Sequence, residues 1–131
     1  GQQGRAHVLE HGAAGGDGDG FSIGGNHFMH SCRRNVDLTY VVMDNSVYGM
    51  TKGQASPTTA SDWTGSKLTP EGPGMPPFRT LEIALSAGAN FISRATANDP
   101  NAVAYVGLDA VDNADLGLGF TEAVLSFGYR L

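Results

Sequence analysis

The chain has 131 residues, a formal net charge of -5 and 19 glycines, which indicates one domain with a modest core and many loops. The acidic balance argues against general binding to nucleic acid or to anionic membranes, since both need basic surfaces. No apolar run reaches the roughly 18 residues of a membrane-spanning helix, and the chain starts without a signal-peptide apolar region, so we expect a cytoplasmic protein.

The first informative segment is an acidic glycine loop at residues 15–20, with the sequence GGDGDG. Backbone N–H groups of a glycine loop at the start of a helix are natural donors to anions. Taken alone, the run also suits a surface turn, because Asp and Gly dominate turns. It has neither the repeated copies of a calcium β-roll nor the glutamate of an EF-hand loop, so neither calcium motif explains it.

A helix and a buried strand are predicted after this loop. Residues 23–34 place Phe28 and Cys32 among polar residues and end in two arginines, which favour a helix C-terminus. Residues 36–43 are β-branched, aromatic and apolar, as in a strand buried on both faces of a parallel sheet. The sequence does not locate the first strand of this βαβ unit: either residues 7–10 form a poor strand or the strand is missing.

A second polar turn follows the predicted strand and contains Asn45. The carboxyl ends of parallel strands meet at one edge of a sheet, so the loops that carry Asp17 and Asn45 can share a ligand. Mg²⁺ takes about six oxygens and is usually held by one or two carboxylates with phosphate oxygens and water. The side chains of Asp17 and Asn45 and the carbonyl of Val47 would leave places for two phosphates and a water. The pattern therefore predicts a magnesium diphosphate site.

The remaining elements are a connector, a helix and further strands. Residues 54–77 hold five of the six prolines and predict an irregular loop, and long ordered loops are often functional. Residues 80–87, stopped by Gly88, predict a helix, and residues 90–94 a parallel strand. A strand-like segment at 123–129 suits an edge hairpin, a piece joined out of context or a tail for another chain.

The histidines and the single tryptophan have simpler explanations than a second site. His27 and His30 are three apart on the predicted helix, but no third metal ligand stands at a useful spacing. His7 and His11 are expected to face solvent. Trp63 is expected to anchor the packing of the connector. No serine stands in a nucleophile-elbow pattern, so hydrolase chemistry is not indicated.

Residues 15–59, GGDGDGFSIGGNHFMHSCRRNVDLTYVVMDNSVYGMTKGQASPTT, closely resemble the thiamine-diphosphate segment of the beta subunit of 2-oxoacid:ferredoxin oxidoreductases. The resemblance runs from about residue 15 to residue 99 and includes FRTLEIALSAGANFISR at 78–94. It implies an α/β fold with a partial parallel sheet, crossover helices, an irregular Pro/Gly-rich loop and a divergent C-terminal strand-like segment. The chain then divides into an atypical N-terminal segment at 1–14, a cofactor-binding core at 15–100 and a divergent segment at 101–131.

The resemblance also assigns residues to the cofactor. Asp17 and Asn45 become side-chain ligands of Mg²⁺, with the carbonyl of Val47 as a third ligand. Met50 and Lys52 fall where the family places residues that face the 2-oxoacid or coenzyme A, without choosing between 2-oxoacids. The residues expected against thiamine diphosphate are Gly16, Asp17, Gly18, Asp19, Gly49 and Thr51.

The implied activity is the oxidative decarboxylation of a 2-oxoacid to acyl-CoA with ferredoxin as the electron acceptor. The glutamate that activates the aminopyrimidine comes from another domain or subunit in related enzymes, so we expect activity only with an alpha-type subunit. The family's [4Fe–4S] cluster needs four cysteines, and Cys32 alone does not support it; we expect Cys32 to be packed in a helix. The alternative is a truncated or rearranged fragment that serves as a non-catalytic structural or partner-bound module.

Overall fold

A computed structural model describes residues 12–50, 52–96, 98–101 and 121–126 of the chain, the last range by its backbone only. The predicted strand at 7–10, the predicted cofactor contact of Thr51, His7 and His11 lie outside the described residues.

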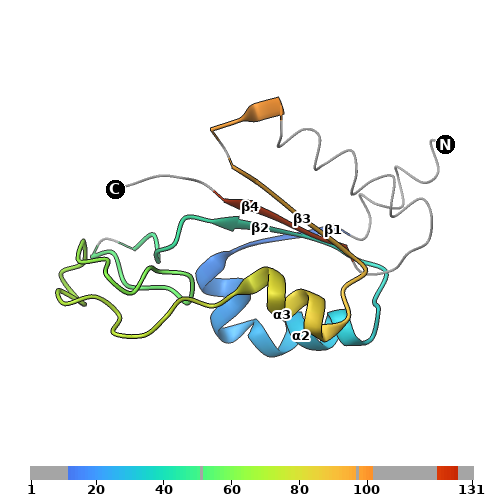
Figure 1. Ribbon diagram of the computed structural model, residues 1–131, viewed down its shortest axis with the longest axis horizontal. Helices are drawn as coiled ribbons and strands as arrows, with labels where there is room; N and C mark the ends of the chain where they lie inside the picture. The colour runs from blue at the N-terminus through green and yellow to red at the C-terminus, as the bar shows by residue number, and fades with distance from the viewer. Residues whose placement is uncertain (1–11, 51, 97, 102–120, 127–131) are drawn as a thin grey trace.

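The core of the described part of the chain is a four-stranded, all-parallel sheet. The strands are β1 (Gly12–Gly16), β2 (Thr39–Asp44), β3 (Phe91–Thr96) and β4 (Thr121–Ser126), in the spatial order β1-β2-β4-β3. All four run in the same direction in Figure 1, so their carboxyl ends share one edge. The predicted α/β fold with a parallel sheet is confirmed.

The first strand is present, and the alternative of a missing strand is wrong. Strand β1 has the sequence GAAGG and ends directly before Asp17. Glycine and alanine have low strand propensity, so the sequence pattern did not reveal it. Its pairing with β2, which aligns Gly16 with Met43, supplies the main-chain hydrogen bonds that a weak strand needs.

The C-terminal strand is central, which makes the edge-hairpin interpretation wrong. Strand β4 lies between β2 and β3 and pairs parallel to both; it begins two residues before the predicted 123, and residues 127–129 of the prediction lie outside the described residues. A parallel neighbour requires a crossover connection, so its place in the sheet is set by tertiary pairing and not by the local pattern.

The predicted helix at 23–34 is present as α2 (Gly25–Arg33). A short π-helical segment, η1 (Asp19–Ile23), precedes it and was not predicted. The N–H of Gly24 donates to the carbonyl of Asp19 at 2.9 Å, and a Cβ at Gly24 would lie only 2.8 Å from that oxygen, so the junction needs glycine. Single-turn π segments of this kind are frequent at functional sites.

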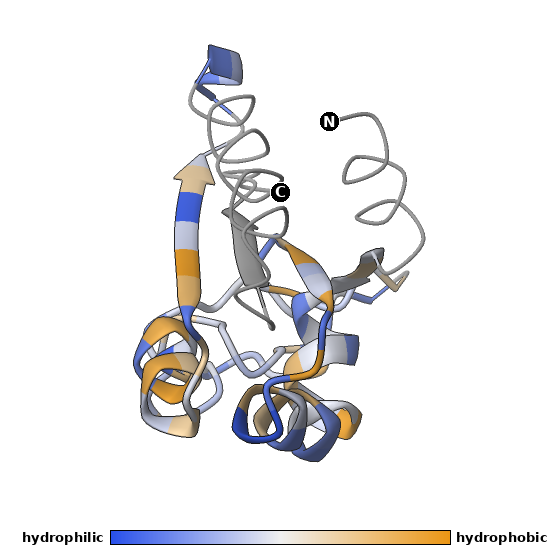
Figure 2. Ribbon diagram, turned by 90° about the vertical axis from the view of Figure 1, so that its right-hand side faces the viewer, coloured by the Kyte–Doolittle hydropathy of each residue, from blue (hydrophilic) through white to orange (hydrophobic). Residues whose placement is uncertain are grey.

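Helix α3 (Thr80–Ala87) has the bounds that the sequence predicts. Its cap, Gly88, has φ of 100°, a left-handed conformation that favours glycine. Helices α2 and α3 pack side by side on the same face of the sheet, as the two views in Figures 1 and 2 show. No described helix is long and apolar enough to cross a membrane.

The hydrophobic core lies between these helices and the sheet. The rings of Phe21 and Phe28 meet edge to face with their centroids 5.2 Å apart, an arrangement that favours aromatic pairs. Cys32 is buried in this cluster, as predicted for a packed helix residue. The buried members are Phe21, Phe28, Cys32, Val42, Ala84 and Ala89.

Candidate functional site

A polar site stands where β1 and β2 end. Asp17 follows β1 directly and Asn45 follows β2, and the parallel register brings the two loops together. The main-chain N–H of Asn45 donates a hydrogen bond to Oδ1 of Asp17 at 3.3 Å. The neighbourhood that the sequence predicted for these two residues is present in the structure.

Asp17 is a buried carboxylate, with a side chain held on one side by hydroxyl groups. Only 2% of the residue is exposed. Its Oδ2 accepts hydrogen bonds from the hydroxyls of Ser56 and Thr58, the second at 2.9 Å. Its Oδ1 receives, within the described part of the chain, only the N–H of Asn45. Burying a carboxylate costs free energy unless a hydrogen bond or an opposite charge compensates it. A positively charged ligand bound at Asp17 would supply such compensation.

The hydroxyl groups come from the proline-rich connector. Ser56, Thr58 and Thr59 form one hydrogen-bonded cluster beneath the two loops. The Thr59 hydroxyl donates to the carbonyl of Ser46 at 2.6 Å, which ties the connector to the turn after β2. Sequence reasoning predicted a functional connector but did not name these residues. The one signal for them was the SPTT motif within the stretch that resembles the family.

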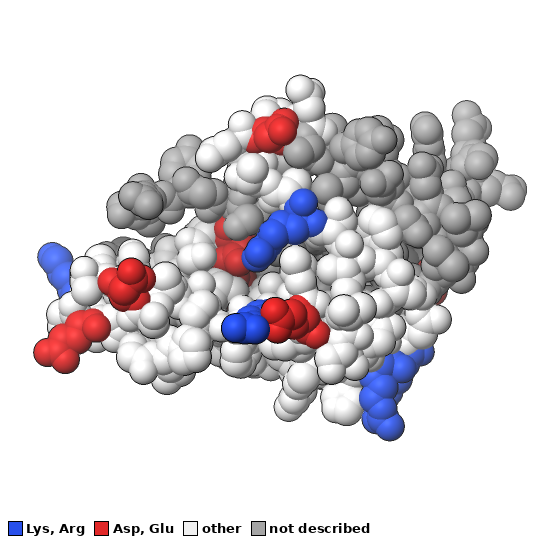
Figure 3. Space-filling model, in the orientation of Figure 1, with Lys and Arg blue, Asp and Glu red and all other residues white. Residues whose placement is uncertain are grey.

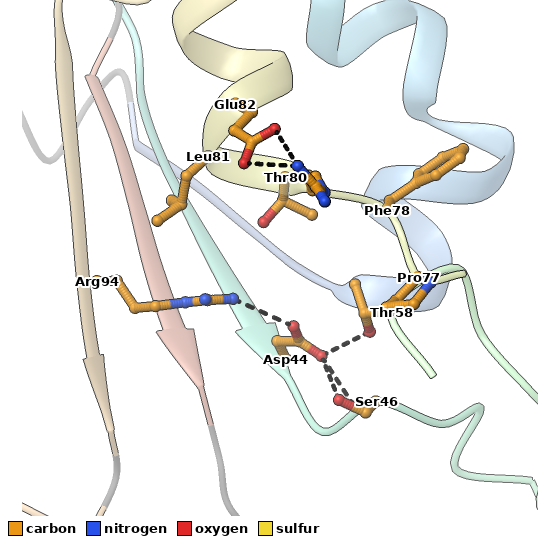
Figure 4. A pocket seen from close by; sticks show the side chains of 10 residues that line it. Asp44, Ser46, Thr58, Pro77, Phe78, Thr80, Leu81, Glu82 and Arg94 are labelled. Carbon is orange, nitrogen blue, oxygen red and sulfur yellow. Dashed lines mark hydrogen bonds and ion pairs between the residues drawn. The ribbon is translucent and has the colours of Figure 1, made fainter. Parts of the chain in front are cut away.

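A second buried carboxylate, Asp44, stands at the end of β2. Its Oδ1 accepts hydrogen bonds from the Ser46 N–H and from the Thr58 hydroxyl, both at 2.8 Å. The guanidinium of Arg94, on β3, lies 4.0 Å from the other carboxylate oxygen. These side chains converge on one wall of a cavity of about 350 Å³ (Figure 4). Sequence reasoning did not single out Asp44 or Arg94.

The turn after β2 presents main-chain and amide oxygens beside Asp17. The Val47 N–H donates to the Asn45 side-chain oxygen at 3.2 Å, which orients the amide. Ser46 has φ of 59°, a left-handed conformation in this turn. No described residue donates a hydrogen bond to the carbonyl of Val47. The turn whose Asn45 N–H contacts Asp17 therefore keeps acceptor capacity on two oxygens, those of the Asn45 side chain and the Val47 carbonyl.

Gly18 packs against a neighbouring aromatic ring. A Cβ at Gly18 would lie 2.3 Å from the Cε1 atom of Tyr48, so a side chain there would force the ring to move. The Tyr48 hydroxyl donates to the carbonyl of Gly18 at 3.1 Å, which fixes the loop against the turn. Gly16 is half-buried, and a Cβ there would meet only the carbonyl of Met43 at 4.0 Å.

Asp19 lies apart from the Asp17 cluster. Its side chain is exposed and lines a different cavity of about 210 Å³, together with His27 and Tyr40. No residue lines both this cavity and the one beside Asp44. Asp19 begins η1, two residues after Asp17. Its main chain is therefore near Asp17, while its carboxylate points to the other cavity.

The residues after Tyr48 form an exposed turn. Met50 is 75% exposed, and Gly49 and Lys52 are exposed as well. The Gly53 N–H donates to the carbonyl of Met50 at 2.9 Å and closes the turn. These residues are thus free to contact a ligand or a partner, although they are not in contact with Asp17.

The rest of the described part of the chain carries no cluster of metal-binding side chains, and the face drawn in Figure 3 carries no large patch of one charge. Among the described residues, no group of three or more His, Cys, Asp or Glu side chains is placed to hold a metal ion. Figure 3 shows acidic and basic side chains intermixed on the visible face, without one continuous patch of a single sign. The Asp17 site is of another kind, with one buried carboxylate beside the turn that carries the Asn45 amide.

Comparison with known proteins shows the family to which this chain belongs. A family model described as the C-terminal TPP binding domain of thiamine pyrophosphate enzymes matches residues 7–112. The KorB subunit of 2-oxoglutarate synthase from Archaeoglobus fulgidus is 52% identical over 85 residues, which cover 65% of this chain and 32% of the relative. The KorB subunit from Methanothermobacter marburgensis is 42% identical over 109 residues, 83% of this chain and 37% of the relative.

A solved structure supports the same relationship. The 2-oxoglutarate:ferredoxin oxidoreductase from Magnetococcus marinus, with 2-oxoglutarate, coenzyme A and succinyl-CoA bound, superposes with a TM-score of 0.75 at 36% sequence identity. The match covers 94% of this chain and 43% of that one. The chain spans about a third of the length of the curated relatives that it matches.

Proposed function

The chain belongs to the thiamine pyrophosphate enzymes, through their C-terminal TPP-binding domain, and on this premise we propose that it is the cofactor-binding part of a 2-oxoacid:ferredoxin oxidoreductase beta subunit. Its relatives named as 2-oxoglutarate synthase and 2-oxoacid:ferredoxin oxidoreductase beta subunits support this assignment. The proposed reaction is the oxidative decarboxylation of a 2-oxoacid to acyl-CoA with ferredoxin as the acceptor.

The contact between the Asp17 and Asn45 loops is the observation that carries the proposal. The loops after β1 and β2 meet at the carboxyl edge of a parallel sheet, where the Asn45 N–H donates to Asp17 Oδ1 and the Val47 N–H donates to the Asn45 side-chain oxygen. The oxygens that we propose as ligands are Asp17 Oδ1, the Asn45 side-chain oxygen and the Val47 carbonyl. This oxygen set fits Mg²⁺, which also takes phosphate oxygens and water. Asp17, Asn45 and the carbonyl of Val47 would hold the ion, and the ion would hold the diphosphate.

The chain's own share is to bind and orient. When bound, thiamine diphosphate supplies the electron sink for decarboxylation. The main chain at Gly16, Gly18 and Asp19 would donate to the diphosphate, because N–H groups at the start of a helical segment favour anions. The buried carboxylates keep the cation in place, and the connector covers that side of the site.

The exposed turn completes the proposed contacts. Gly49 and Thr51 would lie against the cofactor, and Met50 and Lys52 would face the 2-oxoacid or coenzyme A. The Lys52 ammonium is exposed and suits a carboxylate or phosphate. The proposed core is residues 15–100, with β1 and β4 completing its sheet.

The proposal includes partners and a compartment. An alpha-type subunit would supply the groups that act on the aminopyrimidine, and the electrons would pass to ferredoxin. One free thiol, Cys32, suits a reducing compartment such as the cytoplasm. A [4Fe–4S] cluster is not part of the proposal for these 131 residues, because one thiolate does not hold it.

Calorimetric titration with thiamine diphosphate and Mg²⁺ tests the proposal. We expect saturable binding that requires Mg²⁺ and is lost in Asp17→Ala and in Asn45→Ala. Asp62→Ala removes an exposed carboxylate from the connector and is the matched control, with binding unchanged. A folded wild-type chain that binds nothing, alone and with an alpha-type subunit, would refute the proposal and favour a non-catalytic module.

A further inference from the structure

The two oxygens of the Asp17 carboxylate have different surroundings. A carboxylate oxygen has about two lone-pair sites. Oδ2 accepts a hydrogen bond from the Ser56 hydroxyl, and its second site is filled by the Thr58 hydroxyl when the Thr58 proton points to Asp17. Oδ1 receives one long contact, from the N–H of Asn45 at 3.3 Å. The hydroxyl pair thus fixes the carboxylate through Oδ2 and leaves Oδ1 turned toward the Asn45 turn.

Thr58 stands between two buried carboxylates. Its Oγ1 lies 2.9 Å from Oδ2 of Asp17 and 2.8 Å from Oδ1 of Asp44. Its hydroxyl carries one proton, so it donates to one carboxylate at a time, and its oxygen lies between the two carboxylates. Asp17 and Asp44 are 2% and 3% exposed, so water does not replace a missing donor there without rearrangement.

Asp17 and Asp44 belong to different parts of the sheet edge, and among the described residues Thr58 alone hydrogen-bonds to both carboxylates. Asp17 follows β1, Asp44 ends β2, and Thr58 belongs to the connector, 41 residues after Asp17 and 14 after Asp44. Arg94, 4.0 Å from Asp44, offsets part of the negative charge from the cavity side (Figure 4). Thr58 is therefore the point at which the connector, the loop after β1 and the end of β2 meet.

We propose that Thr58 is a positioning residue for the metal: its hydroxyl, with that of Ser56, holds Asp17 by Oδ2 so that Oδ1 is the oxygen offered to Mg²⁺. Outer-shell partners of this kind set the orientation of a metal ligand, and their loss typically lowers metal affinity about 10- to 100-fold. The inference rests on the proposed function, because Mg²⁺ is the ion that Asp17 would bind there.

The side chain of Val is nearly the same size as that of Thr, so Thr58→Val removes the hydroxyl and little else. We expect the Mg²⁺ concentration for half-saturation, measured by calorimetry at a fixed excess of thiamine diphosphate, to rise about tenfold in Thr58→Val. Thr58→Ser keeps the hydroxyl and loses only the methyl group, so this variant should bind Mg²⁺ like the wild type. Thr64→Val makes the same chemical change at an exposed position of the connector and should also bind like the wild type.

The outcomes separate this inference from the proposed function. A folded wild-type chain that shows no Mg²⁺-dependent binding overturns both. Wild-type binding with an unchanged or lower Mg²⁺ requirement in Thr58→Val overturns the positioning role alone. Thermal unfolding without ligand shows whether Thr58→Val still folds. If Thr58→Val does not fold, Thr58→Ser decides. A Mg²⁺ requirement in Thr58→Ser like that of the wild type supports the positioning role, and a raised requirement overturns it.

Discussion

Oδ1 of Asp17 accepts a hydrogen bond from the main-chain N–H of Asn45 at 3.3 Å, across 28 residues of sequence. The contact joins the loops that follow β1 and β2, and it places the only Asp17 oxygen with spare acceptor capacity beside the Asn45 turn. A cation bound there would neutralise a buried charge that the described residues only partly compensate.

Asp17→Asn tests the charge at this position while preserving the shape of the side chain. We expect the ligand-free variant to unfold at the same temperature as the wild type or higher, because a buried charge beside Asp44 is removed. We expect Mg²⁺ and thiamine diphosphate to raise the unfolding temperature of the wild type and not that of the variant. Scanning calorimetry with and without both ligands measures this. An equal ligand-induced rise in both proteins would contradict the role given to the Asp17 charge.

Gly18→Ala tests the contact between the glycine loop and Tyr48. The new methyl group would lie 2.3 Å from the Tyr48 ring, so the ring must move, at a cost of about 1–3 kcal/mol in the free energy of unfolding. Urea denaturation measures the change. Gly25→Ala is the control, since a Cβ there meets nothing within 4 Å and the position is helical. Equal stability of the two variants would show that the ring is not packed against the loop.

Phe28→Ala tests the core between α2 and the sheet. Phe28 is buried and packs edge to face with Phe21, so its truncation should lower the free energy of unfolding by about 3–5 kcal/mol. Met29, the next residue of α2, is exposed, and Met29→Ala should have little effect on the same denaturation curve. A small effect of Phe28→Ala would mean that α2 does not dock as described.

Lys52→Met tests the exposed turn in the assembled enzyme. The substitution keeps much of the side-chain length and removes the charge. Because Lys52 is exposed and away from Asp17, we expect binding of thiamine diphosphate and Mg²⁺ to stay at the wild-type level. We expect the KM for the 2-oxoacid or for coenzyme A to rise in steady-state kinetics with the alpha-type subunit. Unchanged values of KM for both would remove Lys52 from the proposed substrate contacts.

The tryptophan offers an optical measure of the same site. Trp63 is the only tryptophan of the chain, and a Cβ at Gly53 would lie 3.9 Å from both its ring and the Val47 side chain. The ring thus lies close to the turn that would contribute the Val47 carbonyl. It provides a fluorescence signal for Mg²⁺ and cofactor titrations without a label.

The meeting of Asp17 and Asn45 was predictable from the sequence. Asp17 lies in a glycine loop before a predicted helix and Asn45 in a polar turn after a predicted strand, an order typical of a βαβ unit, although the strand before Asp17 was not recognised. Helix α3 and its Gly88 cap were also predictable, because an apolar helix face and a glycine stop can be recognised within a few neighbouring residues.

Other parts of the site depend on contacts that no local pattern encodes. The weak β1 exists through its pairing with β2, and β4 occupies the centre of the sheet through pairing with strands far from it in sequence. Ser56 and Thr58 reach Asp17 from 39 and 41 residues away, so their role required the folded path of the connector. The carboxylate of Asp19 faces another cavity because η1 turns the chain immediately after Gly18.

The most direct test of the metal site is a crystal structure of the chain with thiamine diphosphate and Mn²⁺ in place of Mg²⁺, measured at a wavelength where manganese scatters anomalously. We expect one anomalous peak within about 2.0–2.3 Å of Asp17 Oδ1, the Asn45 side-chain oxygen and the Val47 carbonyl oxygen, in contact with the diphosphate. A peak that lies elsewhere, or cofactor bound without any of these three ligands, would contradict the proposed metal site.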